Sequence, residues 1–249
     1  MENIHPNSAL IKIENLEKRF GDNIVLDRFN LTLNEGENLV IMGKSGSGKS
    51  VMIKCLIGLE IPDKGSIEIM GKKINLLNRE ELDELRTEIG FLFQGSALYD
   101  SMSVRENLEF PLRRHTKKFG KLKDTTPLVM EALENVGLAD AVDLMPSELS
   151  GGMKRRIALA RTLILQPKII IYDEPTTGLD PITAKEIIIL MKSVQKKYNT
   201  SSIIITHDVD CARVISNRMI LLIDGKNYAE GTFQELSLSQ DPKVKAFFK

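Results

Sequence analysis

The spacing of apolar residues changes along the chain, and each change of period predicts a different element. Apolar and polar residues alternate over residues 11–13 and 26–33, which is the period-two pattern of half-buried strands. A continuous apolar run at residues 39–42 predicts a fully buried strand, and residues 49–59 have the spacing of a helix. The N-terminal part therefore predicts strands followed by one helix.

The middle of the chain combines short elements with a long helical segment. Strands are predicted at residues 66–70 and 89–93, and Asn78 with Glu81 forms a capping-box pattern that opens a short charged helix between them. Residues 104–139 are polar with helical spacing, and we expect them to form a helical insertion. The expected breaks in this insertion are Pro111, Gly120 and Pro127.

Beyond Ser150 the pattern alternates regularly between helix and strand. The predicted elements are a helix at 154–165, a strand at 168–172, a helix at 184–198 and a strand at 202–206. Alternation of this kind implies a parallel sheet that is covered by helices. The predicted fold class is therefore α/β.

Composition and charge narrow the classes of function. The 249 residues contain 34 Lys and Arg against 34 Asp and Glu, a balance that argues against a nucleic-acid binder with a broad basic face. No apolar run approaches the ~20 residues that span a bilayer, and the first nine residues lack the pattern of a secretory signal. Cys55 and Cys211 are isolated, so we interpret both as packing residues of a reduced, cytosolic protein.

A glycine-rich loop between a predicted strand and a predicted helix has the pattern G-x-x-x-x-G-K-[ST]. Glycines let the backbone curl so that successive N–H groups converge on phosphate oxygens, and the helix N-terminus adds to the attraction. In this interpretation Lys49 reaches the terminal phosphates and Ser50 completes a Mg²⁺ shell. The alternative is a surface Gly/Ser loop. The residues predicted to bind the nucleotide here are Gly43, Lys44, Ser45, Gly46, Ser47, Gly48, Lys49, Ser50 and Val51.

Two carboxylates end the apolar strand at 168–172. Asp173 is placed to hold Mg²⁺ through water and Glu174 to polarise the attacking water, because buried carboxylates at a strand end need a cation or another partner. The alternative is that Glu174 only caps a turn before Pro175. Together with the glycine-rich loop, this pair predicts nucleotide hydrolysis without deciding among kinases, GTPases, helicases and transport ATPases.

A Ser-Gly-Gly sequence opens the helix at 154–165. Ser150 has the position of a helix N-cap, and a capped helix N-terminus is also an anion site. We expect this terminus to lie too far from the chain's own glycine-rich loop to close on it. It is therefore predicted to act on a nucleotide that a second copy of the protein holds.

With these segments in place, nearly the whole chain resembles the ABC ATPase family. The segment Leu149-Ser150-Gly151-Gly152-Met153 resembles the family's signature motif, and Gly178-Leu179-Asp180 resembles its D-loop, which crosses the dimer. Gln94 resembles the Q-loop glutamine, a ligand near Mg²⁺ that couples to the membrane partner. His207, after the strand at 202–206, resembles the switch histidine at the γ-phosphate, although a lone histidine after a strand is often incidental.

The resemblance implies further features of the fold and the mechanism. Phe20 takes the place of an adenine-stacking aromatic, the alternative being a core Phe at a strand end. The implied fold is a P-loop NTPase with a RecA-like parallel core, an N-terminal antiparallel subdomain, a helical subdomain at about 96–165 and a short extension at about 236–249 of a single 1–249 domain. Two ATP molecules with Mg²⁺ are expected between head-to-tail protomers, whose closure drives a membrane permease.

Two departures from the commonest ABC pattern point to a subfamily. The signature ends in Met153 instead of Gln, and Gln94 is followed by a distinctive stretch that reaches Leu112. Both resemble the Mla/MCE-associated ATPases, which implies phospholipid transport with a permease and an MCE-domain protein at the cytoplasmic face of the inner membrane. The alternatives are an amino-acid importer, a lipoprotein-release exporter, or a soluble ABC ATPase of the iron–sulfur assembly type.

Overall fold

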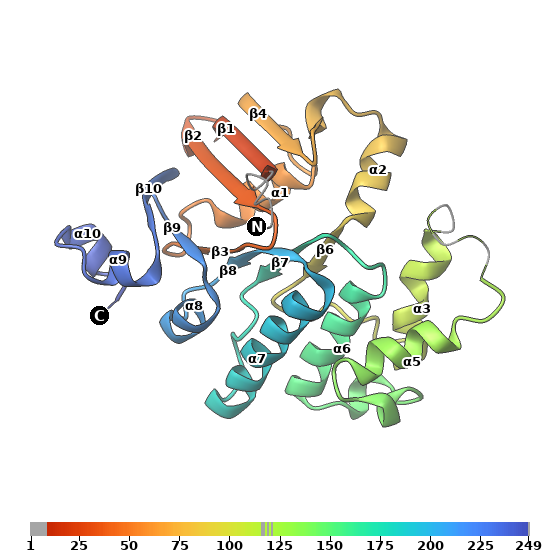
Figure 1. Ribbon diagram of the computed structural model, residues 1–249. Helices are drawn as coiled ribbons and strands as arrows, with labels where there is room; N and C mark the ends of the chain where they lie inside the picture. The colour runs from red at the N-terminus through yellow and green to blue at the C-terminus, as the bar shows by residue number, and fades with distance from the viewer. Residues whose placement is uncertain (1–8, 116–117, 119, 121, 249) are drawn as a thin grey trace, which may run out of the picture. The chain divides into compact units, whose positions relative to one another are not determined.

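The computed structural model describes residues 9–115, 118, 120 and 122–248 (Figure 1). The chain divides into two units. The first unit comprises residues 1–86 and 201–249, and the second unit comprises residues 87–200. Most of the segment from which we expect no secretory signal, residues 1–8, lies outside the described residues. No helix in the described part of the chain combines the length and apolar character needed to cross a membrane.

An antiparallel sheet forms the N-terminal part of the first unit (Figure 1). Its strand order is β2 (Asn23–Asn34), β1 (Ala9–Phe20), β4 (Lys64–Ile69) and β5 (Lys72–Lys73). Alternate residues of β1 and β2 are buried, among them Ile11, Ile13 and Phe29. The period-two pattern of the sequence therefore marks the core-facing side of this sheet.

The second sheet of this unit is largely parallel. β3 (Asn38–Met42) lies between β8 (Ser201–Ile205) and β9 (Arg218–Ile223), both parallel to it, and β10 (Lys226–Gly231) is antiparallel to β9. β3 and β8 are buried over their whole length, which explains the continuous apolar runs at residues 39–42 and 203–205 of the sequence. The helices of this unit are α1 (Lys49–Leu56), α2 (Arg79–Thr87, ending at the unit boundary), α8 (Val209–Ile215), α9 (Phe233–Ser237), α10 (Pro242–Lys245) and the short η1 (Ile74–Leu76).

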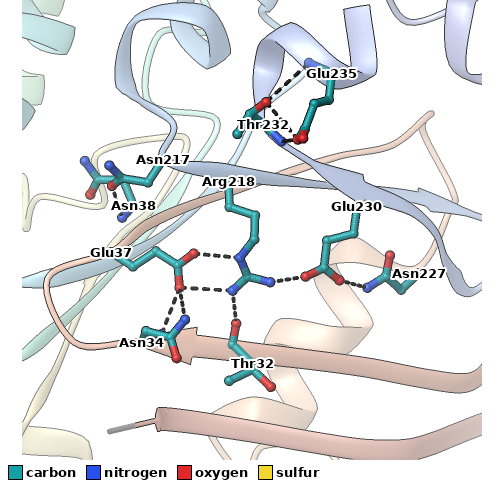
Figure 2. Close-up of polar contacts among 10 residues, drawn as sticks. All are labelled: Thr32, Asn34, Glu37, Asn38, Asn217, Arg218, Asn227, Glu230, Thr232 and Glu235. Atoms are coloured by element: carbon teal, nitrogen blue, oxygen red, sulfur yellow. Dashed lines mark hydrogen bonds and ion pairs between the residues drawn. The ribbon is translucent and has the colours of Figure 1, made fainter. Parts of the chain in front are cut away.

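A polar network around Arg218 ties the two sheets of the first unit together (Figure 2). The Arg218 guanidinium donates to both carboxylate oxygens of Glu37, at 2.7 and 3.0 Å, and also to the carbonyl oxygen of Thr32 on β2. It pairs with Glu230 on β10 as well, while Asn34 donates to Glu37 from its backbone N–H. The doubly bonded Glu37 carboxylate raises the pKa of Arg218, so the guanidinium at the centre of the network stays charged.

The second unit pairs two parallel strands with a set of helices. β6 (Ile89–Leu92) lies beside β7 (Ile169–Asp173). The helices are α3 (Val104–Arg114), α5 (Thr126–Glu134), α6 (Gly151–Leu163), α7 (Pro181–Tyr198) and the short η2 (Ala139–Ala141) and η3 (Pro146–Glu148). Apolar side chains of α3, α5 and α6 form one core, which includes Leu108, Leu112, Val129, Leu133, Ile157 and Ala160.

Most predicted elements are present, with three corrections. Pro111 lies inside α3 and does not break it, because the helix ends at Arg114 and the residues beside the proline, Leu108 and Leu112, are anchored in the core. Pro127 does not interrupt a helix either, since it lies in the first turn of α5, where its missing N–H costs nothing. The helix predicted at 49–59 ends at Leu56. The α/β class, with an antiparallel sheet, a parallel sheet and a helical segment, is confirmed.

Candidate nucleotide-binding site

The glycine-rich loop joins the end of β3 to the start of α1, as the sequence predicts. Gly48 is the N-cap of α1 with φ at 106°, a backbone conformation that a side chain would strain. No side chain caps this helix, and its first turn contains no acidic residue. The N-terminal amides and the positive end of the helix dipole are therefore not neutralised locally, which is the arrangement that binds phosphate.

The side chains of the loop turn toward its own backbone. The Lys49 ammonium donates to the carbonyl oxygens of Gly43, at 2.6 Å, and Lys44, at 3.0 Å. Gly43 packs so closely on β9 that an added Cβ would come within 2.8 Å of the Leu222 carbonyl oxygen. The Ser47 hydroxyl is buried without a hydrogen-bond partner. A buried hydroxyl without a partner is uncommon in folded proteins, and here it lies in the loop predicted to bind phosphate.

A cavity of about 600 Å³ opens beside the loop within the first unit. Its walls are loop residues 44–47, residues 23–25 at the start of β2, residues 222–225 at the end of β9 and in the turn to β10, and the C-terminal residues Lys243, Ala246 and Phe247. This volume lies in the range of small-molecule sites. Phe20 pairs across the β1–β2 hairpin with Asn23 in the cavity wall.

Phe20 itself is 48% exposed, so it is not the core residue of the alternative interpretation. Its ring lies 5.1 Å from the Lys18 ammonium. An exposed aromatic ring at the edge of a cavity is suited to stacking on a nucleobase. The structure therefore leaves the predicted stacking role open to Phe20.

His207 follows β8, which lies beside β3, the strand that leads into the glycine-rich loop. β3 and β8 are parallel, with Ile41 opposite Ile205, and the Thr206 N–H donates to the Ile41 carbonyl at 3.3 Å. Gly43 and His207 consequently leave the sheet at the same carboxyl edge, where α/β proteins bind their ligands. His207 is exposed there, and Asp208 behind it caps α8.

Gln94, Asp173 and Glu174 share the corresponding edge in the second unit. β6 and β7 are parallel, with Leu92 opposite Tyr172, so both polar segments follow directly on neighbouring strands. Glu174 has φ at 50°, an unfavourable backbone conformation for a non-glycine residue. Its carboxylate accepts a hydrogen bond of 3.1 Å from the Thr177 hydroxyl, and its carbonyl closes a turn with the Thr177 N–H.

The Ser-Gly-Gly segment begins α6 three residues earlier than the sequence predicts. Ser150 is the N-cap, and its hydroxyl accepts from the Met153 N–H at 3.2 Å. Ser150 and Gly151 are exposed, and the first turn of α6 contains no acidic residue. The terminus therefore keeps the anion-attracting character expected of it.

Asp180 has a clear structural role as the N-cap of α7. Its carboxylate accepts from the N–H groups of Ile182 and Thr183, at 3.1 and 3.0 Å, and from the Thr183 hydroxyl. These hydrogen bonds, that of the Thr183 hydroxyl first, lower the pKa of Asp180. The carboxylate is thus held ionised and fixed at the start of α7.

The predicted residues are thus distributed over the two units. Phe20, the loop 43–51 and His207 belong to the first unit, whereas Gln94, Asp173, Glu174, Ser150–Gly152 and Asp180 belong to the second. Sequence reasoning missed the remaining cavity walls. The Asp224-Gly225 turn carried the only usable signal, a dipeptide typical of hairpins.

Comparison with known proteins decides the family. The model of the family described as ABC transporter matches residues 26–177, which is more than half of the chain. The chain belongs to the ABC transporter family. This family, together with a similar solved cassette that contains ADP and Pi, the products of ATP hydrolysis, confirms the predicted enzyme class, an ATPase.

Three curated relatives cover nearly the whole chain. The intermembrane phospholipid transport system ATP-binding protein MlaF of Haemophilus influenzae is 42% identical over 98% of this chain and 91% of its own length. The probable ribonucleotide transport ATP-binding protein mkl of Mycobacterium leprae is 40% identical over 97% of the chain and 69% of its own length. The methionine import ATP-binding protein MetN of Clostridium tetani is 39% identical over 95% of the chain and 73% of its own length.

A solved structure gives the same result for the fold. The dimeric ATP-binding cassette MJ0796, bound to ADP and Pi, is 35% identical, with a TM-score of 0.80 over 90% of this chain and 98% of its own. The likeness to MlaF confirms the resemblance stated from the sequence, and the likeness to MJ0796 supports a cassette that works as a dimer.

Proposed function

We propose that this ATPase energises the transport of phospholipids between membranes, as a homodimer bound to a permease and an MCE-domain protein. The observation that carries the proposal is the 42% identity with MlaF over 98% of the chain. The Met-ending signature and the stretch from Gln94 to Leu112 support it independently, because the sequence alone links both to Mla/MCE-associated ATPases. The cassette docks on the cytoplasmic face of the inner membrane.

The first unit supplies the groups that bind ATP. The backbone amides of the glycine-rich loop and of the α1 N-terminus hold the phosphates, and Lys49 leaves the carbonyls of Gly43 and Lys44 to contact the terminal phosphates. The nucleoside lies toward Phe20, whose exposed ring stacks on the base. His207 contacts the γ-phosphate from the same sheet edge.

The residues present fit Mg²⁺ bound together with ATP. No cluster of three or more acidic, His or Cys residues is found in the described residues, and Mg²⁺ in ATPases needs only one or two protein ligands besides phosphate and water. Ser50, Asp173 and Gln94 would supply such oxygen ligands. An ion held there would supply positive charge against the phosphates.

Glu174 is the proposed general base. Its strained backbone and the hydrogen bond from Thr177 fix the carboxylate, which orients the attacking water and accepts its proton. Ser150, Gly151 and Gly152 bind the γ-phosphate held by the second copy, and Asp180 fixes the start of α7 at the dimer interface. Closure of the dimer on two ATP molecules drives the permease, and hydrolysis releases it.

Two other cargoes compete with phospholipid. The names of mkl and MetN refer to ribonucleotide transport and methionine import, and both proteins are similar to this chain over nearly its whole length. The segment after Gln94 lies where the family docks its permease. It favours the lipid system because its sequence resembles that of the Mla/MCE-associated ATPases. In the second unit this segment is held in one conformation by the buried Asn107, which bonds the backbone of Tyr99 and Met102.

Affinity purification from solubilised membranes tests the proposal. The tagged chain should recover a permease and an MCE-domain protein, and mass spectrometry of the purified complex should find bound phospholipid. The Lys49→Ala variant is the matched control, because it impairs ATP binding and should still recover both partners. Recovery of a methionine permease or of no membrane protein would refute the lipid assignment.

A further inference from the structure

Arg155 on α6 has an environment that packing alone does not explain. Its side chain is buried, with 3% of the residue exposed, although it carries a charge. Within the described part of the chain its guanidinium makes no ion pair, and its Nε atom has no hydrogen-bond partner. Burying an unpaired cation is costly, and an apolar side chain of similar length would fill the same space at lower cost.

The two hydrogen bonds of Arg155 reach the two loops that carry the proposed chemistry. One Nη atom donates to the Phe93 carbonyl at 2.7 Å, directly before Gln94. The other donates to the Thr177 carbonyl at 3.4 Å. Thr177 in turn donates its hydroxyl to the Glu174 carboxylate at 3.1 Å. Three hydrogen bonds, joined through the covalent structure of Arg155 and Thr177, therefore link the backbone beside Gln94 to the carboxylate of Glu174, entirely within the second unit.

A second arginine of α6 fastens the neighbouring stretch of the same loop. Arg161 donates to the carbonyl oxygens of Ser96 and Ala97, at 3.1 and 2.7 Å. Both of these residues have positive φ, a less favourable backbone conformation for non-glycine residues, and the two hydrogen bonds from Arg161 support it. The helix that begins at Ser150 thus fixes the segment after β6 at two points.

We propose that Arg155 is a positioning residue for hydrolysis, which aligns Glu174 through Thr177 and couples this alignment to the position of Gln94 and of the helix that begins at Ser150. This inference rests on the proposed role of Glu174. Arg155 touches neither nucleotide nor water. Its loss leaves the groups that bind ATP intact and misplaces the general base.

Steady-state ATPase kinetics of the full-length protein test this role. Arg155→Met should lower kcat by about tenfold to a hundredfold with KM for ATP changed by less than about twofold, as expected when only transition-state alignment is lost. Arg155→Lys keeps the charge but places its N–H donors on a single nitrogen, and it should recover part of the rate. Arg156→Met is the matched control, because Arg156 is its neighbour on α6 but pairs with Glu186 at the surface, and its kcat should stay within about twofold.

Variants of Thr177 provide a second test if Arg155→Met does not fold. Thr177→Val removes the hydroxyl and should lower kcat as Arg155→Met does, whereas Thr177→Ser should not. In the Glu174→Gln background, neither Arg155→Met nor Thr177→Val should reduce the residual rate further, because residues that act through one group are not additive.

The outcomes separate the two claims. A wild-type rate in Glu174→Gln overturns the assignment of Glu174 and with it the general-base proposal. If Glu174→Gln loses ATPase activity as expected, but folded Arg155→Met or Thr177→Val keeps full activity, only the positioning role is overturned. A rise in KM without a fall in kcat also overturns it, since binding would then be what Arg155 supports.

Discussion

Replacing Arg218 by Met should remove the charge from the network in Figure 2 while keeping the apolar stem. The side chain of Arg218 is 22% exposed and that of Glu37 10%, so the pair is largely shielded from water. After the change, Glu37 keeps the donors of Asn34 and loses both bonds from the guanidinium. Thr32 and Glu230 lose their bonds from the same group.

The expected cost follows from what is left behind. Breaking a buried ion pair by removing one partner costs about 3–5 kcal/mol, because the other charge stays buried without compensation. The partial exposure of Arg218 places the expected loss in the free energy of unfolding near the lower limit, at about 3 kcal/mol. With a urea m-value of about 3 kcal/mol/M, the midpoint of unfolding should fall by about 1 M.

Urea denaturation followed by circular dichroism measures this shift. Arg213→Met is the control, because Arg213 pairs with Asp210 on α8 with 61% and 76% of the two side chains exposed, and its loss should cost less than about 0.5 kcal/mol. Adding Glu37→Gln to Arg218→Met should recover part of the loss by neutralising the orphaned carboxylate. Equal midpoints for Arg218→Met and Arg213→Met would refute the reasoning.

Three further predictions concern separate features of the chain. Phe20→Ala should raise KM for ATP by about tenfold, while Phe20→Tyr should not, because stacking contributes about 1–3 kcal/mol; equal KM values would exclude stacking. Tyr228→Phe should raise the pKa of Asp241, measured by NMR titration, because the Tyr228 hydroxyl is the largest cause of its lowering. Because the folded-state pKa of Asp241 is lowered, its ionisation stabilises the fold above the unfolded-state pKa, and this stabilisation is lost as the pH falls through the folded-state pKa. An unchanged Asp241 titration in Tyr228→Phe would show that the hydrogen bond is absent in solution. Cys55 and Cys211 are fully buried, and burial raises the pKa of Cys55 to about 11, so Ellman's reagent should label neither before unfolding, and rapid labelling of the native protein would contradict this packing.

Periodicity predicted the elements whose burial is uniform or mainly alternating. β3 and β8 are buried throughout, and the alternation in β1 and β2 faces one core, so their patterns determine strand type directly. The capping box of Asn78 and Glu81 is present, with both reciprocal hydrogen bonds at 2.9 and 3.0 Å. Local signals of this kind need no knowledge of tertiary contacts.

The failures arise where tertiary packing outweighs local preference. α3 continues through Pro111 because its flanking leucines are buried in the core of the second unit. The walls of the cavity come from four segments far apart in the sequence, which no local pattern connects. The sequence did not predict the hydrogen-bonded link through Arg155 either. A basic residue between two other basic residues is typical of a solvated helix face, and only the structure shows that Arg155 is buried.

The rate of ATP hydrolysis by Glu174→Gln, measured beside its affinity for ATP, tests the central claim most directly. The account predicts that hydrolysis falls by at least about a hundredfold, while ATP still binds and the closed dimer becomes more stable in gel filtration. Glu134→Gln, an exposed change on α5, should hydrolyse ATP at the wild-type rate. Normal turnover in Glu174→Gln would contradict the account.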